Sequence, residues 1–342
     1  MKKLSEIMKP VPMSSGFRMD GYWVWDGSVI KGDDGKYHMF ASRWPKTLPM
    51  HPGWMIKSEI VHAVCDTPYG EFKFCDVVFR ARGPEYWDGR ITHNPQVTKI
   101  GDTYVIYYTG STYLWDCKDE EVTSDHPSVV LARSRKRVGV AYSKNLYGPW
   151  TRSDRPLLEA RPGFDDGYLT SNPVACSDTD GNIFMAYKGR RYVPFETHPY
   201  RFGPMKLLYA KGNNPFSLER PEDNLLFGDI DGELEDPFVW YDNGYHVIAK
   251  DMDGRVCGLK FGGVHAYSKD GKTWEIDKEP FFTRELLYEN GEIRHMGNME
   301  RPCILFEDGK PVCAYFATSD GSFNGGFMDC KNTWVVAIPL ED

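Results

Sequence analysis

"DGRITHNP" at residues 88–95 and "DGYLTSNP" at residues 166–173 are two copies of one pattern. In each copy an Asp-Gly step is followed by a short segment and then by Asn-Pro, with six residues from the Asp to the Asn. A pattern that recurs along a chain is the signature of a repeat architecture, in which each copy forms one structural unit. The two copies therefore predict a protein built from similar units.

Three further segments carry the same pattern in altered form. Residues 20–27 read "DGYWVWDG", residues 231–237 read "DGELEDP", and residues 300–302, "ERP", keep only its second half. We define the anchor of each unit as the residue before the closing Pro or Gly. The five anchors are Asp26, Asn94, Asn172, Asp236 and Arg301, and they are spaced by 68, 78, 64 and 65 residues.

Each anchor is followed by segments typical of β-strands and hairpin turns. The turns read "GDDGK", "IGDT", "DTDGN", "YDNG" and "EDGK", and Asp-Gly and Asn-Gly are favoured in tight hairpins. A third strand follows in every unit, and a fourth in all but the last. We predict an all-β fold, a five-bladed β-propeller with four-stranded blades, over residues 1–342 as a single domain.

The blades are expected to start near residues 24, 93, 171, 235 and 300. Because the last unit lacks an outer strand, residues near the N-terminus are expected to supply it and close the ring. A series of hairpins in a β-sandwich is the alternative, and the parallel between all five units disfavours it.

Composition and charge exclude several classes of function. The net charge of −8 argues against nucleic acid as a partner held by bulk electrostatics. No apolar run approaches the roughly 18 residues that cross a bilayer, so no membrane partner is expected. The first residues lack the apolar core of a secretion signal, which favours the cytoplasm, or the periplasm or exterior if a signal was removed. No zinc-binding helix, phosphate loop or nucleophile elbow is present.

The anchors bring candidate catalytic groups toward one end of the propeller. If each anchor begins the innermost strand of its blade, the residues around it lie at the rim of the central funnel. Carboxylates that converge there push one another's pKa values apart, and cleavage of a glycosidic bond requires such an acid and base. Neighbours along a strand face opposite sides, so only one of Glu235 and Asp236 is expected to face a ligand. The candidate catalytic residues are Asp26, Glu235, Asp236, Glu300 and His295.

Polar and aromatic residues near the anchors are candidates for substrate binding. They are His93, Asn94, Asn172, Trp25, Trp87, Arg90 and Arg301. Each also has a structural interpretation, because Asn at a turn caps its own backbone and a propeller core uses many aromatic rings. The arginines suit a carboxylate or sulfate on an acidic glycan, or they neutralise the carboxylates of the funnel itself.

The repeated segments resemble the five-bladed propeller glycoside hydrolases of families 43, 62, 32, 68, 117 and 130. "WDGSVIKGDDGKYHMFAS" is similar to their first blade, in which the Asp is the general base in family 43, and this implies that role for Asp26. "EDP" is similar to their fourth-blade motif and implies that Glu235 is the general acid. The chain departs from the pattern at Asn172, where that family has an Asp, and at Gly27, which replaces a Pro. Family 117 has an acid late in the chain, which implies Glu300 or His295.

The resemblance and the carboxylates together predict a glycoside hydrolase that acts from the end of plant or algal glycan oligosaccharides. The alternatives are a lyase that uses His93 or His295 with a tyrosine on an arginine-held uronate, a glycoside phosphorylase, and a sugar-binding propeller without activity. No cofactor is required. Propellers of this kind commonly hold one ion on the axis, and a structural calcium ion could lie there through His295 or His93.

Overall fold

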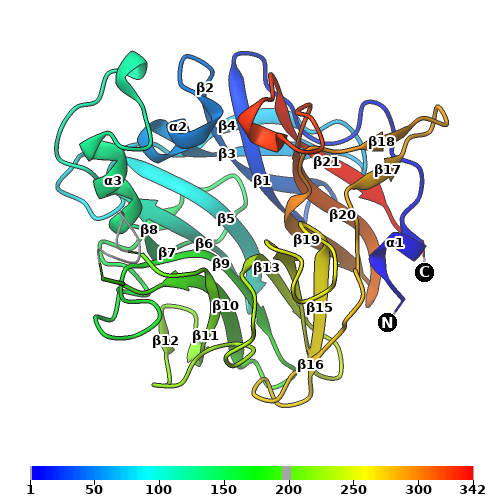
Figure 1. Cartoon of the computed structure of the whole chain (residues 1–342). Coiled ribbons are helices and arrows are strands. Elements are labelled where there is room, and N and C mark those ends of the chain that lie inside the picture. The colour runs from blue at the N-terminus through cyan, green and yellow to red at the C-terminus, as the bar shows by residue number, and fades with distance from the viewer. Residues whose placement is uncertain (1, 195–201, 342) are drawn as a thin grey trace.

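The computed structural model describes residues 2–194 and 202–341, and it is a five-bladed β-propeller (Figure 1). Blades 1 to 4 are four-stranded antiparallel sheets whose strands follow one another in chain order. Blade 1 contains β1 (Tyr22–Lys31), β2 (Tyr37–Pro45), β3 (Glu59–Cys65) and β4 (Lys73–Phe79). Blade 2 contains β5 (Ile91–Ile100), β6 (Thr103–Ser111), β7 (Arg137–Ser143) and β8 (Thr151–Arg152).

The remaining blades repeat this order. Blade 3 contains β9 (Leu169–Ser177), β10 (Ile183–Arg190), β11 (Lys206–Asn214) and β12 (Ser217–Glu219). Blade 4 contains β13 (Leu234–Tyr241), β14 (Tyr245–Asp251), β15 (Gly263–Ser268) and β16 (Glu275–Ile276). Blade 5 contains β19 (Glu300–Glu307), β20 (Lys310–Ser319) and β21 (Thr333–Pro339). The innermost strands begin within two residues of the predicted starts, so the predicted blade order is confirmed.

Short helices lie in the connections between strands. The longest are α2 (Met50–Lys57), between β2 and β3, and α3 (Pro127–Ser134), between β6 and β7, and the two pack together (Figure 1). The other short elements are α1 (Leu4–Ile7), η1 (Asp119–Glu121), η2 (Gly326–Met328) and the hairpin of β17 (Glu285–Leu287) and β18 (Ile293–His295). None of the described helices is long and apolar enough to span a bilayer.

The N-terminal segment completes blade 5, as the sequence predicts. Phe17 and Val335 of β21 exchange two backbone hydrogen bonds of 2.9 and 3.0 Å, and the Lys9 amide donates to the Pro339 carbonyl at 2.9 Å. These contacts form isolated bridges and not a continuous strand. The ring is therefore closed by the two ends of the chain, which lie close together in Figure 1.

All five innermost strands contain the same bulge at the anchor. Each anchor residue has a positive φ, between 51° and 64°, and together with the following Pro or Gly it faces a single residue of the second strand. Asn and Asp tolerate this left-handed conformation, whereas Arg301 adopts it against its ordinary preference. The expectation that the anchor begins the innermost strand is wrong: each strand starts before its anchor. The Pro is tolerated because the ladder is already interrupted at the bulge.

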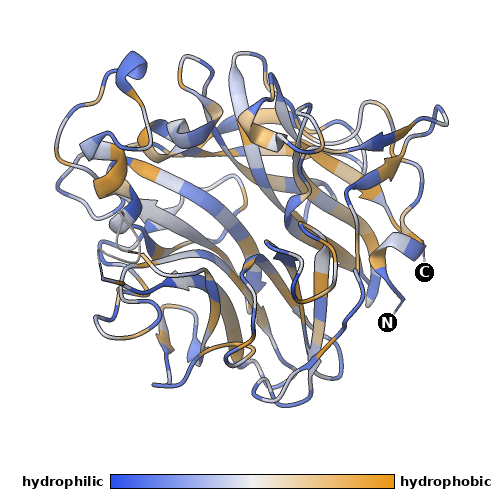
Figure 2. Ribbon diagram, viewed as in Figure 1, coloured by the Kyte–Doolittle hydropathy of each residue, from blue (hydrophilic) through white to orange (hydrophobic). Residues whose placement is uncertain are grey.

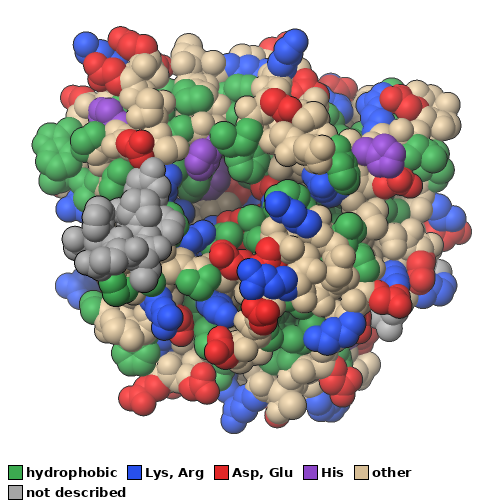
Figure 3. All heavy atoms as spheres, in the orientation of Figure 1, with side chains coloured by type: hydrophobic (Ala, Val, Ile, Leu, Met, Phe, Trp, Pro, Cys, Tyr) green, Lys and Arg blue, Asp and Glu red, His purple; other side chains and the backbone are tan. Residues whose placement is uncertain are grey.

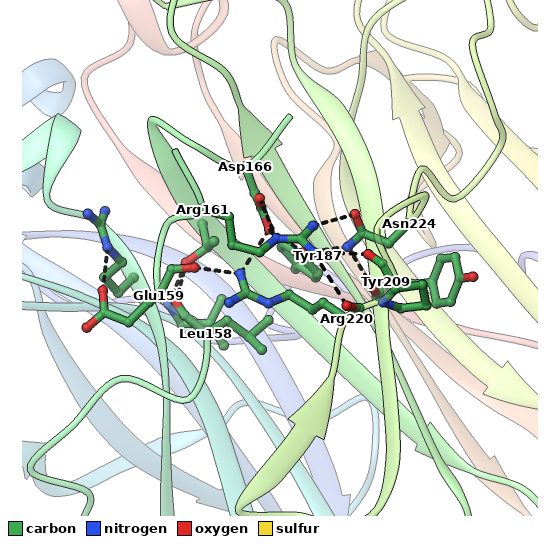
Figure 4. A network of polar contacts seen from close by, with 12 residues as sticks. Leu158, Glu159, Arg161, Asp166, Tyr187, Tyr209, Arg220 and Asn224 are labelled. Carbon is green, nitrogen blue, oxygen red and sulfur yellow. Dashed lines mark hydrogen bonds and ion pairs between the residues drawn. The ribbon is translucent and has the colours of Figure 1, made fainter. Parts of the chain in front are cut away.

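In blades 2 and 3 the first Asp of the repeated pattern is a buried hub of hydrogen bonds. In blade 3, Asp166 accepts from Arg161 Nε at 3.0 Å, Arg220 Nη1 at 2.9 Å and the Tyr187 hydroxyl at 2.7 Å (Figure 4). Its carboxylate is fully buried and carries two arginine partners, which is the condition for burying a charge without a large penalty.

Blade 2 repeats this hub at the equivalent residue. Asp88 accepts from Arg82 Nε at 2.7 Å, the Tyr108 hydroxyl at 2.7 Å and Arg152 Nη1 at 3.3 Å. The next residue must be Gly, since a Cβ on Gly89 would lie 1.5 Å from a backbone oxygen. The Asp-Gly step is therefore architectural in blades 2 and 3, where it fastens the loop before the inner strand to the second strand of the blade, whereas Asp20 and Asp231 in the other copies are exposed.

Apolar side chains fill the space between neighbouring blades. Figure 2 shows hydrophobic residues concentrated along the strands, whereas the peripheral loops are largely hydrophilic. The largest cluster joins the N-terminal segment to blades 1, 4 and 5 and contains the fully buried Phe17, Tyr315 and Phe316. Burial of this surface stabilises the closed ring and keeps the axial strands in a fixed position.

Candidate active site

A cavity of about 440 Å³ opens at the end of the propeller axis that carries α2 and α3. Figure 3 shows a hollow near the middle of this face, with histidine and basic side chains at its edge. Its volume lies within the range of roughly 300–1,000 Å³ typical of small-molecule sites. The wall combines the inner strands with residues from α2, α3, β10 and η2.

The five anchors lie next to one another around the axis, and we call them the axial ring. Asn94 Nδ2 donates to Asp26 Oδ1 at 2.9 Å, and Asn172 Nδ2 donates to Asp236 Oδ1 at 2.6 Å. The Arg301 amide donates to Asp236 Oδ2 at 3.3 Å, and its guanidinium Nε lies 3.3 Å from Asp26 Oδ1. Thr109 on β6 links the two asparagines, since its hydroxyl donates to Asn94 Oδ1 and accepts from the Asn172 amide. Polar contacts therefore join all five blades.

Glu235 and Asp236 both face the cavity, although they are neighbours on one strand. Regular alternation would send them to opposite faces, and the expectation that only one faces a ligand is wrong. The reason is the bulge, because the positive φ of 55° at Asp236 turns its side chain to the same side as Glu235. The bulge thus brings two carboxyl groups into one site.

The surroundings of these two carboxyl groups shift their pKa values in opposite directions. Burial opposes ionisation of Glu235, but Lys188 and Lys250 outweigh burial and lower the pKa of Glu235 to about 2. Burial and then the negative charge of Glu235 raise the pKa of Asp236 to about 7, against the opposing effect of Arg301. At neutral pH one group is ionised and the other retains part of its proton.

Two lysines occupy equivalent positions in successive blades, and each forms a hydrogen bond with a carboxylate of the cavity. Lys188 on β10 donates to Glu235 of blade 4, and Lys250 on β14 donates to Glu300 of blade 5. Asn298 Nδ2 also donates to Glu300 at 2.8 Å. Each carboxylate is therefore fixed by an ammonium group of the preceding blade.

His93 lies deep in the wall and is neutral. Its Nδ1 lies 2.8 Å from the Ser58 hydroxyl, and its ring stacks on Trp54 with centroids 4.5 Å apart. Burial, together with Arg301 and Lys136, lowers the pKa of His93 to about 4 despite the nearby Asp26. His93 can therefore donate or accept a hydrogen bond but carries no charge at neutral pH.

Most of the predicted site residues meet at this cavity. Those that line it are Trp25, His93, Asn94, Asn172, Glu235, Asp236, Glu300 and Arg301. Asp26 belongs to the axial ring but does not line the cavity, and its side chain is 1% exposed. Its oxygens accept hydrogen bonds from Ser42 and Asn94, and the pKa of Asp26 is lowered because His93, Arg301 and these hydrogen bonds outweigh burial.

Three predicted residues lie away from the cavity. His295, on β18, has a side chain that is 62% exposed and pairs with Glu285 on the neighbouring strand. Trp87 donates its indole N–H to the Ser153 carbonyl within blade 2. Arg90 pairs with Asp116 at 3.1 Å. The reason is local: these side chains follow the loops and the hairpin outside the inner strands, so nearness to an anchor in sequence does not bring them to the axis.

The axial residues do not fit a structural calcium ion. A calcium site needs six to eight oxygen ligands, whereas the Arg301 guanidinium lies between the carboxylates of Asp26 and Asp236, 3.3 and 3.7 Å from their oxygens. Among the described residues no group of three His, Cys, Asp or Glu side chains is arranged to hold a metal. Arg301 supplies the positive charge that the axial carboxylates need.

Sequence reasoning missed the cationic and α2 residues of the wall. The missed residues include His51 on α2, Arg133 on α3, Lys136, and Lys188 on β10. One signal was present, because Lys188 and Lys250 end the similar segments "IFMAYK" and "YHVIAK". The α2 and α3 residues had no such signal, since they lie in connections that differ between blades.

No protein-family model matches the chain, and no curated protein is significantly similar to it in sequence. Several solved structures share its fold. Zg3597, a family 117 glycoside hydrolase of the marine bacterium Zobellia galactanivorans, is 16% identical with a TM-score of 0.63 over 98% of this chain and 89% of that one. A thermostable family-43 glycoside hydrolase is 12% identical with a TM-score of 0.63 over 98% and 93% of the two chains.

An endo-arabinase from Bacteroides thetaiotaomicron is 13% identical, with a TM-score of 0.57 over 97% of each chain. At these levels of identity the likeness concerns the fold. The chain therefore has the five-bladed propeller fold of these glycoside hydrolases, as its sequence predicts.

Proposed function

We propose that this protein is a glycoside hydrolase that removes a terminal sugar from an oligosaccharide of a plant or algal glycan. Asp236 acts as the proton donor to the leaving oxygen, and Glu235 is the carboxylate that activates water or attacks the anomeric carbon. The observation that supports this most directly is the presence of two carboxyl groups at one cavity with pKa values shifted in opposite directions.

The electrostatics of the two carboxyl groups support this assignment of roles. Hydrolysis near neutral pH needs one carboxyl group that can give a proton and one that is ionised. Glu235, with a pKa of about 2, has no proton to give, whereas Asp236, with a pKa of about 7, does. This assignment gives Glu235 the opposite role to the one that the family resemblance implies. Asp26 then supports the site by holding Arg301 and Asn94 in the axial ring.

The rest of the wall supplies the contacts that a sugar needs. Trp25 and the partly exposed Trp54 supply aromatic surface for the C–H groups of a sugar ring, whereas Trp44 is fully buried. Glu300, fixed by Lys250 and Asn298, is available as an acceptor for a sugar hydroxyl. A cavity at the end of the axis accepts the end of a chain, which supports action from one terminus.

Glycosides with poor and with good leaving groups distinguish the role of Asp236 as the acid from the role of Glu235. We expect Asp236→Asn to lower kcat about 10²- to 10⁴-fold on glycosides with a poor leaving group, and far less on dinitrophenyl glycosides, which leave without protonation. Glu235→Gln should lower turnover of both substrates. Glu307→Gln is the control, since this carboxylate pairs with Lys31 outside the cavity. Equal losses for Asp236→Asn on both substrates would contradict its role as the acid.

The products test the reaction class. Mass spectrometry of wild-type products should show one added water per bond cleaved and a monosaccharide released from one end. An unsaturated product without added water would indicate a lyase, and a sugar phosphate formed only with phosphate would indicate a phosphorylase. Binding of oligosaccharides that persists in both variants, with no turnover by the wild type, would indicate a sugar-binding propeller.

A further inference from the structure

The cavity carries more positive than negative charge, although the protein as a whole has a net charge of −8. Among the described residues its lining contains three carboxyl groups, those of Glu235, Asp236 and Glu300. It also contains five basic side chains: Arg133, Lys136, Lys188, Arg190 and Arg301. The wall therefore has the opposite sign to the net charge of the protein, and a cationic wall attracts an anion.

The carboxylates already have their own partners. Lys188 forms an ion pair with Glu235, Lys250 forms one with Glu300, and Arg301 lies beside Asp236. None of these partners is Lys136, so the cationic excess is not explained by neutralisation of the catalytic acids.

Lys136 lines the cavity directly before β7, and the residue is only 6% exposed. Within the described ranges its Nζ has neither a hydrogen-bond acceptor nor a carboxylate at ion-pair distance, and the contact that it makes is with the ring of Trp54, 4.9 Å from the centroid. Burial, together with the positive charges of Lys188 and Arg133, lowers the pKa of Lys136 well below its ordinary value. A buried amine without a partner costs stability unless a ligand supplies one.

Arg301 gives a second, independent indication. Its Nε and Nη1 are buried and form no hydrogen bond of good geometry with the described residues, although the carboxylates of the axial ring lie nearby. Two basic side chains at one cavity thus retain unused donors, whereas buried polar groups in proteins are otherwise almost always hydrogen-bonded.

We propose that Lys136 marks a subsite for an anionic group carried by the sugar substrate, either a carboxylate or a sulfate ester. Lys188 and Arg190 on β10 lie on the same side and add to the attraction, and Trp54 provides the apolar surface beside it. This assignment rests on the proposed function, because it specifies which sugars enter the same cavity. The substrate class is then an acidic oligosaccharide, such as one that ends in a uronic acid or a sulfated sugar.

Binding of the anion should restore the proton on Lys136. An anion beside the amine favours its charged form, so binding should take up a proton and weaken as the pH rises. The charged groups that shift the pKa of Lys136 are Lys188 and Arg190 on β10, Arg133 on α3, and Glu235 on β13. Lys136 in turn lowers the pKa values of two histidines, His51 on α2 and His93 on β5. The last two are neutral at pH 7 and do not contribute to this uptake.

Calorimetric titration tests the proposal without requiring turnover. Sodium sulfate and sodium acetate are titrated at constant ionic strength against chloride, and glucuronate and galacturonate are compared with their neutral amides. The wild type should bind each anion more tightly than its neutral counterpart and take up protons in buffers of different ionisation enthalpy. Lys136→Met should weaken anion binding about 10- to 100-fold, and Lys136→Arg, which keeps the charge, should retain most of it.

Lys99→Met is the control, since that lysine pairs with Asp33 on the outer surface. Identical anion binding by the wild type and Lys136→Met, or no preference of the wild type for uronates over their amides, would overturn the proposal. Tighter binding of sulfate than acetate, with release of sulfated sugars, identifies a sulfate ester, and the reverse identifies a uronate. Phosphate-dependent formation of a sugar phosphate would overturn the proposal, because the anion bound at Lys136 would then be phosphate, a second substrate, and not a group carried by the sugar.

The two proposals fail separately. If neutral glycosides are hydrolysed and Lys136→Met has no effect on anions, the hydrolase stands and the anion subsite is wrong. If anions bind through Lys136 and no glycoside is hydrolysed, the subsite stands and the proposed reaction is wrong.

Discussion

Arg301 Nε lies 3.3 Å from Asp26 Oδ1, and this contact joins the last blade of the propeller to the first. Both residues are anchors of the same repeat, yet one has become a cation and the other an anion. The pair lies where the predicted calcium ion would have been, with Asp236 on the other side at 3.7 Å. Ring closure on the axis thus depends on a side chain of the protein itself.

Replacement of Arg301 should destabilise the whole propeller. Arg301→Met leaves the buried Asp26 carboxylate without its counter-charge, and loss of one partner of a buried pair costs about 3–5 kcal/mol. Chemical denaturation should show this loss of unfolding free energy. Arg294→Met is the matched control, because Arg294 is partly exposed and its partner Glu292 is exposed, and it should change stability by less than about 1 kcal/mol. A loss at Arg301 as small as at Arg294 would show that the ring contact is not stabilising.

Asp236 should make stability depend on pH between about 4 and 7. Its pKa of about 7 in the folded protein lies above its ordinary value of 3.8, so the folded state binds more protons in this window. The contribution of Asp236 to the free energy of unfolding is therefore fully present below about pH 4, and it is lost as the pH rises to 7. Asp236→Asn should remove this slope, a difference on the order of 4 kcal/mol.

Asn is a suitable replacement at this position because the anchors of blades 2 and 3 are already Asn with the same positive φ. Urea denaturation of both proteins from pH 4 to pH 8 gives the comparison. Parallel stability profiles for the wild type and Asp236→Asn would contradict the raised pKa.

Lys188 should set the acidic limit of activity. Burial raises the pKa of Glu235, and Lys188 is the main group that offsets burial and lowers this pKa to about 2, so its loss leaves burial opposed by Lys250 and Arg190. We expect the acidic limb of the kcat/KM profile of Lys188→Met to move upward by more than about one pH unit, because Glu235 is then protonated at mildly acidic pH. The alkaline limb, which reflects Asp236, should move much less. Lys31→Met, at an exposed ion pair, should leave both limbs in place.

The Asp166 hub should matter for stability and not for chemistry. Asp166→Ala leaves Arg161, Arg220 and the Tyr187 hydroxyl without their shared acceptor, and we expect a loss of about 3–5 kcal/mol. Asp88→Ala should have a similar cost in blade 2. Asp229→Ala, at a carboxylate that is 94% exposed, is the control and should be nearly neutral. Circular dichroism melts measure all three, and a neutral Asp166→Ala would contradict the architectural role of the repeated Asp.

The sequence by itself determined the propeller. Hairpin turns, apolar strands and anchors are local and periodic features, so their spacing along the chain gave the blade order, the N-terminal closure and most of the carboxylates at the cavity. The same local reasoning failed at Glu235 and Asp236, because alternation holds only for regular strands and the bulge at each anchor breaks it.

Only the tertiary structure decided which side chains face the ligand. Lys136 and the α2 residues reach the cavity through long connections whose path depends on packing against other blades, and no periodic pattern encodes that path. His295 lies close to an anchor in sequence but on a hairpin outside the ring, for the same reason. The charges of the site also depend on the fold, since the pKa values of Glu235 and Asp236 are set by burial and by charged groups on other strands, including Lys188 of blade 3 and Lys250 of blade 4.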